Sequence, residues 1–166
     1  MRWWVEWVVL GGTPCAQREG PIVAGFLGRF LHQLDPKGRI SLPAQFRRGR
    51  ESESFVLIRT QPEALTLYPE DAWADVQNDL LDYMKRQPEH RLKVLRITAD
   101  AVEVVPDKQG RILIPERMRE AAGLTSEAWV VGAINKIQIW DPARFETATS
   151  DETDDAFERH MKSVLI

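Results

Sequence analysis

Residues 35–47 read DPKGRISLPAQFR, and residues 107–119 read DKQGRILIPERMR. The second stretch repeats the first at a constant offset, and six residues are identical at identical spacing. These pairs are Asp35/Asp107, Gly38/Gly110, Arg39/Arg111, Ile40/Ile112, Pro43/Pro115 and Arg47/Arg119. A match of this density indicates that the chain contains two copies of one structural unit.

The repeat extends beyond these two stretches. Residues 55–58 (FVLI) and 65–69 (LTLYP) follow the first stretch, and residues 129–131 (WVV) and 137–142 (IQIWDP) follow the second. Each unit is therefore predicted to run strand, turn, strand, short helix, strand, turn, strand and longer helix. Because there are only two units, a solenoid is not indicated.

Local chemistry in the second unit supports this order. Residues 102–104 alternate Val, Glu and Val, which is typical of a half-buried strand. Residues 107–110 form a predicted turn, in which Asp bonds to nearby backbone and Gly supplies a positive φ. Pro115 and Gly123 suit the beginning and the end of a helix. Residues 135–136 (Asn-Lys) are expected to form a tight hairpin turn, since Asn tolerates the left-handed region.

The boundaries follow from the repeat. The first unit with a connecting helix is predicted at residues 25–96, the second unit at residues 97–145, and an acidic helix or tail at residues 146–166. Residues 1–24 are expected to lie outside the fold, as a natural extension, a product of an upstream start codon or a signal peptide. Their apolar run is too short to span a bilayer.

Charge is unevenly distributed along a chain whose net charge is −3. Residues 25–59 contain seven basic and three acidic residues, whereas residues 141–166 contain seven acidic and three basic residues. The first unit is therefore the basic part of the chain. The acidic end is typical of a solvated helix face or tail.

Catalytic and metal-binding motifs are absent from the sequence. The three histidines, His32, His90 and His160, are scattered, and there is no HExxH, CxxC, Walker A or G-x-S-x-G motif. Cys15 is the single cysteine, so no disulfide can form within the chain, which fits a reducing cytoplasm. We therefore expect no enzyme activity, catalytic residue, metal, cofactor or small-molecule substrate, and His32 is interpreted as a surface or packing residue.

The tips at residues 35–39 and 107–111 are the remaining candidate site. One interpretation is structural: Asp accepts backbone N–H groups and pairs with the Arg four residues later. The other is functional, because the major groove of DNA admits a two-stranded ribbon and Arg can bind guanine O6 and N7. A Lys at a tip would suit a phosphate group.

Aromatic and apolar residues elsewhere favour packing roles. Trp73, Trp129 and Trp140 recur near matching positions of the two units and are interpreted as core or subunit-contact residues rather than base-stacking platforms. Residues 70–96 place apolar side chains at roughly helical spacing, which predicts an amphipathic helix packed on the rest of the fold.

Longer segments carry a family resemblance. Residues 25–28 (GFLG) with 34–43 (LDPKGRISLP), and residues 107–115 with 122–124 (AGL) and 132–140 (GAINKIQIW), resemble the two halves of the bacterial MraZ family. The resemblance covers about Gly25 to Phe145, and both D-x-x-x-R motifs that mark this family are intact.

The resemblance implies an α+β, β-rich fold: a pseudo-twofold, AbrB-like swapped-hairpin β-barrel with flanking helices, formed by one chain. It also implies a nucleoid-associated cytoplasmic regulator of transcription, which binds direct repeats in double-stranded DNA upstream of the division and cell-wall gene cluster. Such proteins form homo-oligomeric rings. A membrane partner is not expected.

The implied DNA contacts carry over most directly to Lys37 and Arg39. Arg111 and Lys108 are the weaker candidates in the second copy, where Gln109 replaces the lysine of the first. Further candidates in the basic stretch are Arg29 and Arg47, and the turn-shaping residues are Asp35, Gly38, Asp107 and Gly110. The alternative function is an antitoxin-like protein-interaction module with the same barrel.

Overall fold

The computed structural model describes residues 25–50, 53–150 and 161–164. The expectations for residues 1–24, including Cys15, and for residues 151–160, including His160, lie outside these ranges. The two repeated units and the segment between them lie almost entirely within the described part of the chain.

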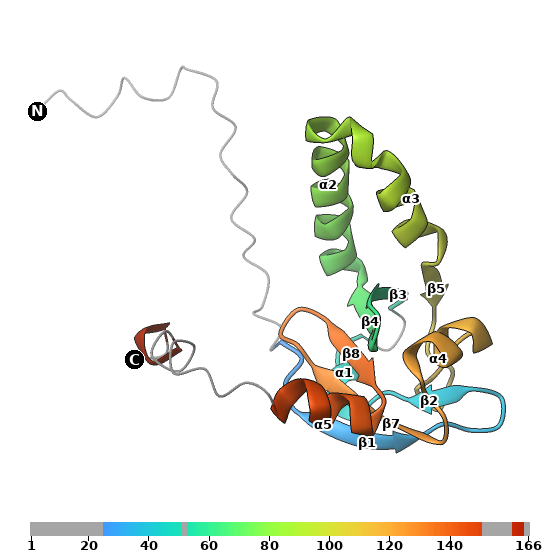
Figure 1. Ribbon diagram of the computed structural model, residues 1–166. Helices are drawn as coiled ribbons and strands as arrows, with labels where there is room; N and C mark the ends of the chain where they lie inside the picture. The colour runs from blue at the N-terminus through green and yellow to red at the C-terminus, as the bar shows by residue number, and fades with distance from the viewer. Residues whose placement is uncertain (1–24, 51–52, 151–160, 165–166) are drawn as a thin grey trace, which may run out of the picture.

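Each unit contains the predicted order of elements (Figure 1). The first unit comprises β1 (Arg29–Gln33), β2 (Arg39–Ser41), α1 (Ala44–Arg47), β3 (Phe55–Gln61), β4 (Ala64–Pro69) and α2 (Glu70–Arg86). The second comprises β5 (Val102–Val104), β6 (Arg111–Leu113), α4 (Glu116–Ala122), β7 (Glu127–Gly132), β8 (Ile137–Trp140) and α5 (Pro142–Ser150). Between them lie the 3-10 turn η1 (Pro88–His90) and the helix α3 (Arg91–Ala99).

The strands of the two units exchange partners. A six-stranded antiparallel sheet has the order β1-β7-β8-β4-β3-β5, and β2 pairs with β6 in a separate two-stranded sheet. The first strand of each unit therefore pairs with the third strand of the other unit: Arg29 faces Val131, and Val104 faces Phe55. If each strand is replaced by its counterpart in the other unit, the same strand order is obtained, read from the opposite edge of the sheet. The expected pseudo-twofold, swapped-hairpin α+β fold is confirmed, with β1 and β5 as the hydrogen-bonding edges of the larger sheet.

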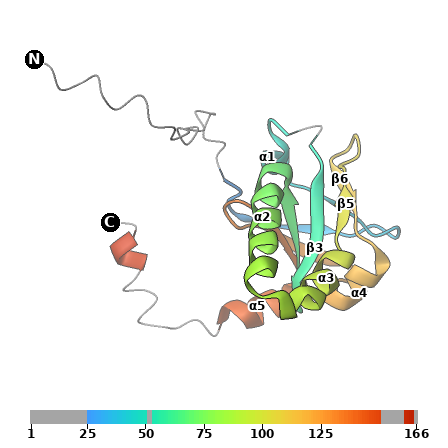
Figure 2. The same ribbon diagram turned by 90° about the horizontal axis from the view of Figure 1, so that it is seen from above.

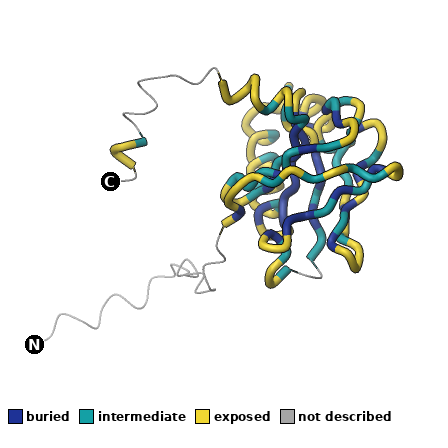
Figure 3. Tube along the Cα trace, turned by 90° about the horizontal axis from the view of Figure 1, so that it is seen from below, coloured by how far each residue is buried: buried dark blue, intermediate teal, exposed yellow. Residues whose placement is uncertain are grey.

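The core is built jointly by both units. Its fully buried side chains include Ile40, Phe55, Leu57, Leu65 and Leu67 from the first unit and Ile112, Ile114, Val130, Ile137 and Ile139 from the second. Figure 3 shows buried segments at the centre and exposed ones around the outside. Burying a large apolar side chain contributes about 1.5–3 kcal/mol, and residues of both units belong to this one core cluster.

Two of the predicted local signals are realised and one is wrong in detail. Pro115 directly precedes α4, and Gly123 ends this helix with a left-handed φ of 70°. The turn between β7 and β8 also forms, closed by a hydrogen bond from the N–H of Ala133 to the carbonyl of Lys136. Its left-handed residue is Ile134, with φ of 66°, and not Asn135. Ile134 is held in this conformation by two backbone hydrogen bonds to Phe26.

The connecting segment is a helical hairpin rather than one helix. The start of α2 packs against the sheet through Trp73 and Val76, which contact Tyr68 and Ile58. Figure 2 shows α2 alongside β3, with α3 turning back at the far end of α2. The packing role predicted for Trp73 is confirmed, while the far part of α2 lies against α3 instead of the sheet.

Candidate nucleic-acid interface

The turn of the first unit is closed by Asp35. Its Oδ1 accepts hydrogen bonds from the N–H groups of Lys37 and Arg39, each at 2.9 Å. Its Oδ2 accepts one from Nε of Arg39 at 2.6 Å. Gly38 donates its N–H to the Asp35 carbonyl at 2.9 Å and has a φ of 81°. A single carboxylate thus closes the turn and fixes the direction of the Arg39 guanidinium.

The second turn repeats this bonding pattern at Asp107. The N–H groups of Gln109 and Arg111 donate to Asp107 Oδ1 at 2.9 Å. Arg111 donates to Asp107 Oδ2 through Nε at 2.9 Å and through Nη2 at 2.8 Å. The Arg111 side chain therefore uses more of its guanidinium within the protein than Arg39 does.

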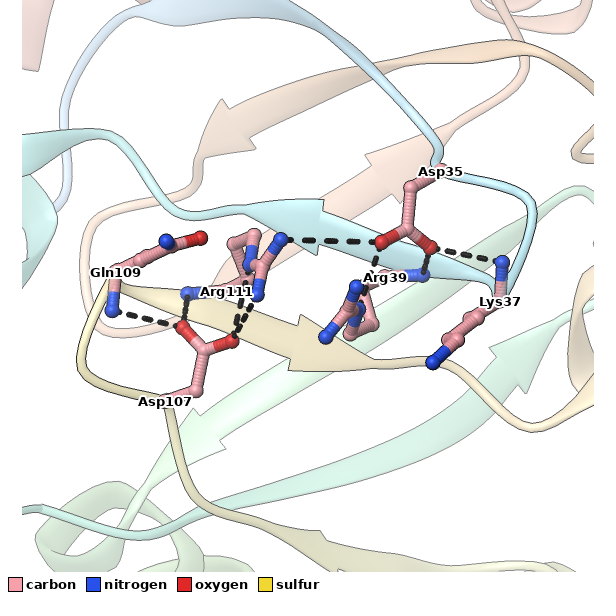
Figure 4. Close-up of polar contacts among 6 residues, drawn as sticks. All are labelled: Asp35, Lys37, Arg39, Asp107, Gln109 and Arg111. Atoms are coloured by element: carbon pink, nitrogen blue, oxygen red, sulfur yellow. Dashed lines mark hydrogen bonds and ion pairs between the residues drawn. The ribbon is translucent and has the colours of Figure 1, made fainter.

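Strand pairing brings the two turns into one two-stranded ribbon. Ile40 faces Ile112 at its centre, and both side chains are fully buried. Because side chains alternate along a strand, Arg39 and Arg111 lie on the opposite, outer face of the ribbon. Figure 4 shows them in its middle, and Nη1 of Arg111 lies 3.9 Å from Oδ2 of Asp35.

The ends of the ribbon differ between the two units. Lys37 lies at one end and Gln109 at the other (Figure 4). Lys37 and Lys108 are exposed, whereas the side chains of Arg39 and Arg111 are only 32% and 26% accessible. The site thus combines two oriented guanidinium groups with exposed ammonium groups at its ends, and most of the predicted residues lie in it.

Electrostatics keep both carboxylates ionised. Hydrogen bonds from Arg39, first from its backbone N–H, lower the pKa of Asp35, and burial only partly opposes this. The side-chain and backbone hydrogen bonds of Arg111 lower the pKa of Asp107 to about 2. Both turns therefore keep their Asp–Arg pairs at neutral pH.

Arg47, a predicted DNA contact, lies against the turn of the opposite unit. Its guanidinium covers Gly110, and its Nε donates to the Leu42 carbonyl at 3.1 Å. Arg119 covers Gly38 in the same way. Arg119 was not among the predicted site residues, although its identity with Arg47 in the repeat was a visible signal. Each of these two arginines therefore packs against the glycine in the turn of the opposite unit.

Arg29 is separated from the ribbon tips. It lies at the end of β1 remote from the turn, with its guanidinium 4.9 Å from the ring centroid of Trp129. Its Nη1 is 3.5 Å from Oε1 of Glu146 in α5. The contacts of Arg29 therefore connect β1 to β7 and α5 rather than to the other candidate residues.

Other chemistry is sparse in the part of the chain that the structure describes. His32 is half-buried in β1, where desolvation lowers its pKa, in line with the predicted packing role. The described residues contain no group of three or more His, Cys, Asp or Glu placed to bind a metal ion. None of the described helices is both long and apolar enough to traverse a bilayer.

Comparison with known proteins identifies relatives over most of the chain. A family model for the MraZ protein, described as antitoxin-like, matches residues 26–95 and again residues 97–164. A protein of Pediococcus pentosaceus is 39% identical over 140 residues, covering 84% of this chain and 96% of the relative. A protein of Thermomicrobium roseum is 41% identical over 117 residues, covering 70% of this chain and 82% of the relative. A protein of Acetivibrio thermocellus is 35% identical over 127 residues, covering 76% of this chain and 88% of the relative.

All three relatives are called "Transcriptional regulator MraZ". The two separate matches of the family model coincide with the two units that exchange strands in the fold. Sequence, fold and the repeated Asp–Arg turns agree, and the chain belongs to the MraZ family.

Proposed function

We propose that this protein is a DNA-binding regulator of transcription that reads repeated promoter sites with the β2–β6 ribbon. Its relatives are called transcriptional regulators. The observation that carries the proposal is the pair of outward-facing arginines in the middle of a two-stranded ribbon, each oriented by its own Asp. A ribbon of this kind fits the major groove.

Arg39 is the main base-reading residue in this proposal. Its side-chain hydrogen bond to Asp35 uses Nε, which leaves Nη1 and Nη2 for guanine O6 and N7. Arg111 gives Nε and Nη2 to Asp107, and its Nη1 lies near Asp35. The first unit also has Lys37 where the second has Gln109. The first turn therefore reads the bases, and the second contributes Lys108 to phosphate contacts.

Assembly compensates for the small footprint of one ribbon. A homo-oligomeric ring would present several ribbons to direct repeats in double-stranded DNA, and effective concentration would then raise affinity. The DNA must bend to reach several ribbons at once. Only the ribbon face has to be positive, so a net charge of −3 is compatible with DNA binding if the acidic C-terminal segment faces away. We place this activity on the nucleoid, at the promoter of the division and cell-wall gene cluster.

Fluorescence anisotropy with a promoter fragment containing direct repeats tests the proposal. Arg39→Ala should weaken binding by about 10- to 100-fold, the range expected for a lost bidentate base contact. Arg111→Ala should weaken it less. The control, Arg59→Ala, removes an equal charge from an exposed position of β3 and should have little effect. Binding should also fall steeply with salt.

Unchanged affinity of the Arg39 variant would overturn the assignment. A stoichiometric protein that co-purifies with the chain and blocks DNA binding would instead support the antitoxin-like interaction module.

A further inference from the structure

Leu113 is an exposed apolar side chain on the outer face of the β2–β6 ribbon. The register of the ribbon places Leu113 directly opposite Arg39, and Ser41 directly opposite Arg111. Residues that face each other across an antiparallel pair share one face, so these four side chains lie together on the side away from the core. Leu113 is 54% accessible, whereas the preceding Ile112 is fully buried. The ribbon therefore displays a leucine beside the Arg39 guanidinium.

Packing within the protein does not account for a leucine at this position. The outward positions of a strand with one face in solvent are ordinarily polar. The first unit follows this rule, because Ser41 occupies the place that Leu113 occupies in the second unit. Ile112 and Ile114, on either side of Leu113, are fully buried and supply the core contacts of this segment. The exposed surface of Leu113 is therefore available to a ligand that covers the ribbon.

We propose that Leu113 reads the 5-methyl group of a thymine next to the guanine that Arg39 binds. This inference rests on the proposed function and adds a specificity-determining residue to it. Thymine presents a methyl group in the major groove, where apolar side chains contact it. Facing side chains of two strands have Cβ atoms about 4.5–5.5 Å apart, and successive nucleotides of one DNA strand are about 3.4 Å apart along the axis. Arg39 and Leu113 can therefore reach neighbouring base pairs.

The other half of the ribbon carries a different pair of side chains. Ser41 faces Arg111, and a serine hydroxyl both donates and accepts hydrogen bonds, so it suits several bases and has no preference for a methyl group. One ribbon thus contains one methyl-reading position. A single substitution at Leu113 should remove the whole preference for the methyl group.

Replacement of thymine by deoxyuridine throughout a promoter fragment with direct repeats tests the inference. Deoxyuridine pairs with adenine as thymine does but lacks the 5-methyl group, and in DNA made by a polymerase thymine is the only source of this group. The wild type should bind the deoxyuridine fragment at least about fourfold more weakly, the factor expected for one methyl group withdrawn from water. Leu113→Ser should bind the thymine fragment about as weakly, with little further loss on the deoxyuridine fragment.

Two further variants separate loss of the methyl contact from general effects. Leu113→Met keeps the apolar volume and should keep most of the discrimination between the two fragments. Leu27→Ser removes a leucine that is 63% accessible and lies outside the ribbon, so it should keep the wild-type ratio of affinities. Fluorescence anisotropy gives each ratio. Leu113→Ser should retain cooperative melting by circular dichroism, because the side chain is exposed and serine stands at the equivalent place in the first unit.

Equal binding of the two fragments by the wild type, or full discrimination by Leu113→Ser, would overturn the inference. Either result leaves the ribbon proposal standing if Arg39→Ala still loses binding to the thymine fragment. Unchanged affinity of Arg39→Ala would instead overturn the base-reading assignment of the proposed function, whatever the ratio between the two fragments.

Discussion

Arg119 of the second unit lies directly over Gly38 of the first: a Cβ atom built on Gly38 would be 2.6 Å from Nε of Arg119. Arg47 covers Gly110 in the reciprocal position. The backbone reinforces this exchange, since Ile114 donates its N–H to the Gly38 carbonyl at 3.0 Å. Each turn is therefore supported by an arginine and a strand from the opposite unit.

Gly38→Ala should destabilise the protein more than Gly49→Ala, as measured by urea unfolding. Both glycines have a positive φ, which costs about 1–2 kcal/mol for a residue with a Cβ. A Cβ on Gly49 would meet no atom within 4 Å, so this variant adds no clash of the kind expected at Gly38. Gly38→Ala must also displace Arg119. The cost of Gly38→Ala should therefore be smaller when Arg119 is already Ala, and strictly additive costs would contradict the contact.

Asp107→Asn should lower stability at neutral pH, and the difference from wild type should disappear in acid. The pKa of Asp107 in the folded protein is about 2, below its ordinary 3.8. Stabilisation by the carboxylate is therefore fully present above about pH 4 and is lost as the pH falls through about 2. Thermal melts between pH 7 and pH 2 measure this convergence. Asp79→Asn, which removes the same charge from the exposed face of α2, is the control. A pH-independent difference for Asp107→Asn would contradict the charge effect.

Gln109→Lys should strengthen DNA binding by giving the second turn the lysine that the first has. One additional phosphate contact should steepen the dependence of log affinity on log salt concentration by about 1. Anisotropy titrations at several salt concentrations provide the measurement. Gln87→Lys adds the same charge at the end of α2 and should leave the slope unchanged. An equal change in both variants would indicate a nonspecific effect of net charge.

Ile134→Asn should stabilise the protein by about 1 kcal/mol. A β-branched residue at φ of 66° is strained, and Asn tolerates this region at lower cost. The Ile134 side chain is 73% accessible, so its replacement sacrifices little apolar burial. Ile134→Val keeps the strain and should remain close to wild type. The midpoint of chemical denaturation tests this, and a lower midpoint for the Asn variant would show that the Ile134 side chain packs in a way its exposure does not indicate.

Local chemistry was sufficient to predict the turns and the order of elements, because Asp, Gly and Pro act on their immediate neighbours. Asp35 and Asp107 bond to residues within four positions. The strand exchange came only from the family resemblance, since the pairing of β1 with β7 joins segments far apart in the chain. The position of Arg47 over Gly110 depends on that pairing, so residue spacing within the first unit could not predict it. At Ile134, backbone bonds to Phe26 override the residue preference that favoured Asn135.

The exchange of strands within one polypeptide has a genetic consequence. In a barrel made from two identical chains, any substitution appears in both halves at once. Here the halves are encoded separately, so Lys37 can remain in one turn while Gln109 occupies the equivalent place in the other, within a shared core. One half can change how it contacts a ligand while its counterpart preserves the pairing on which both depend.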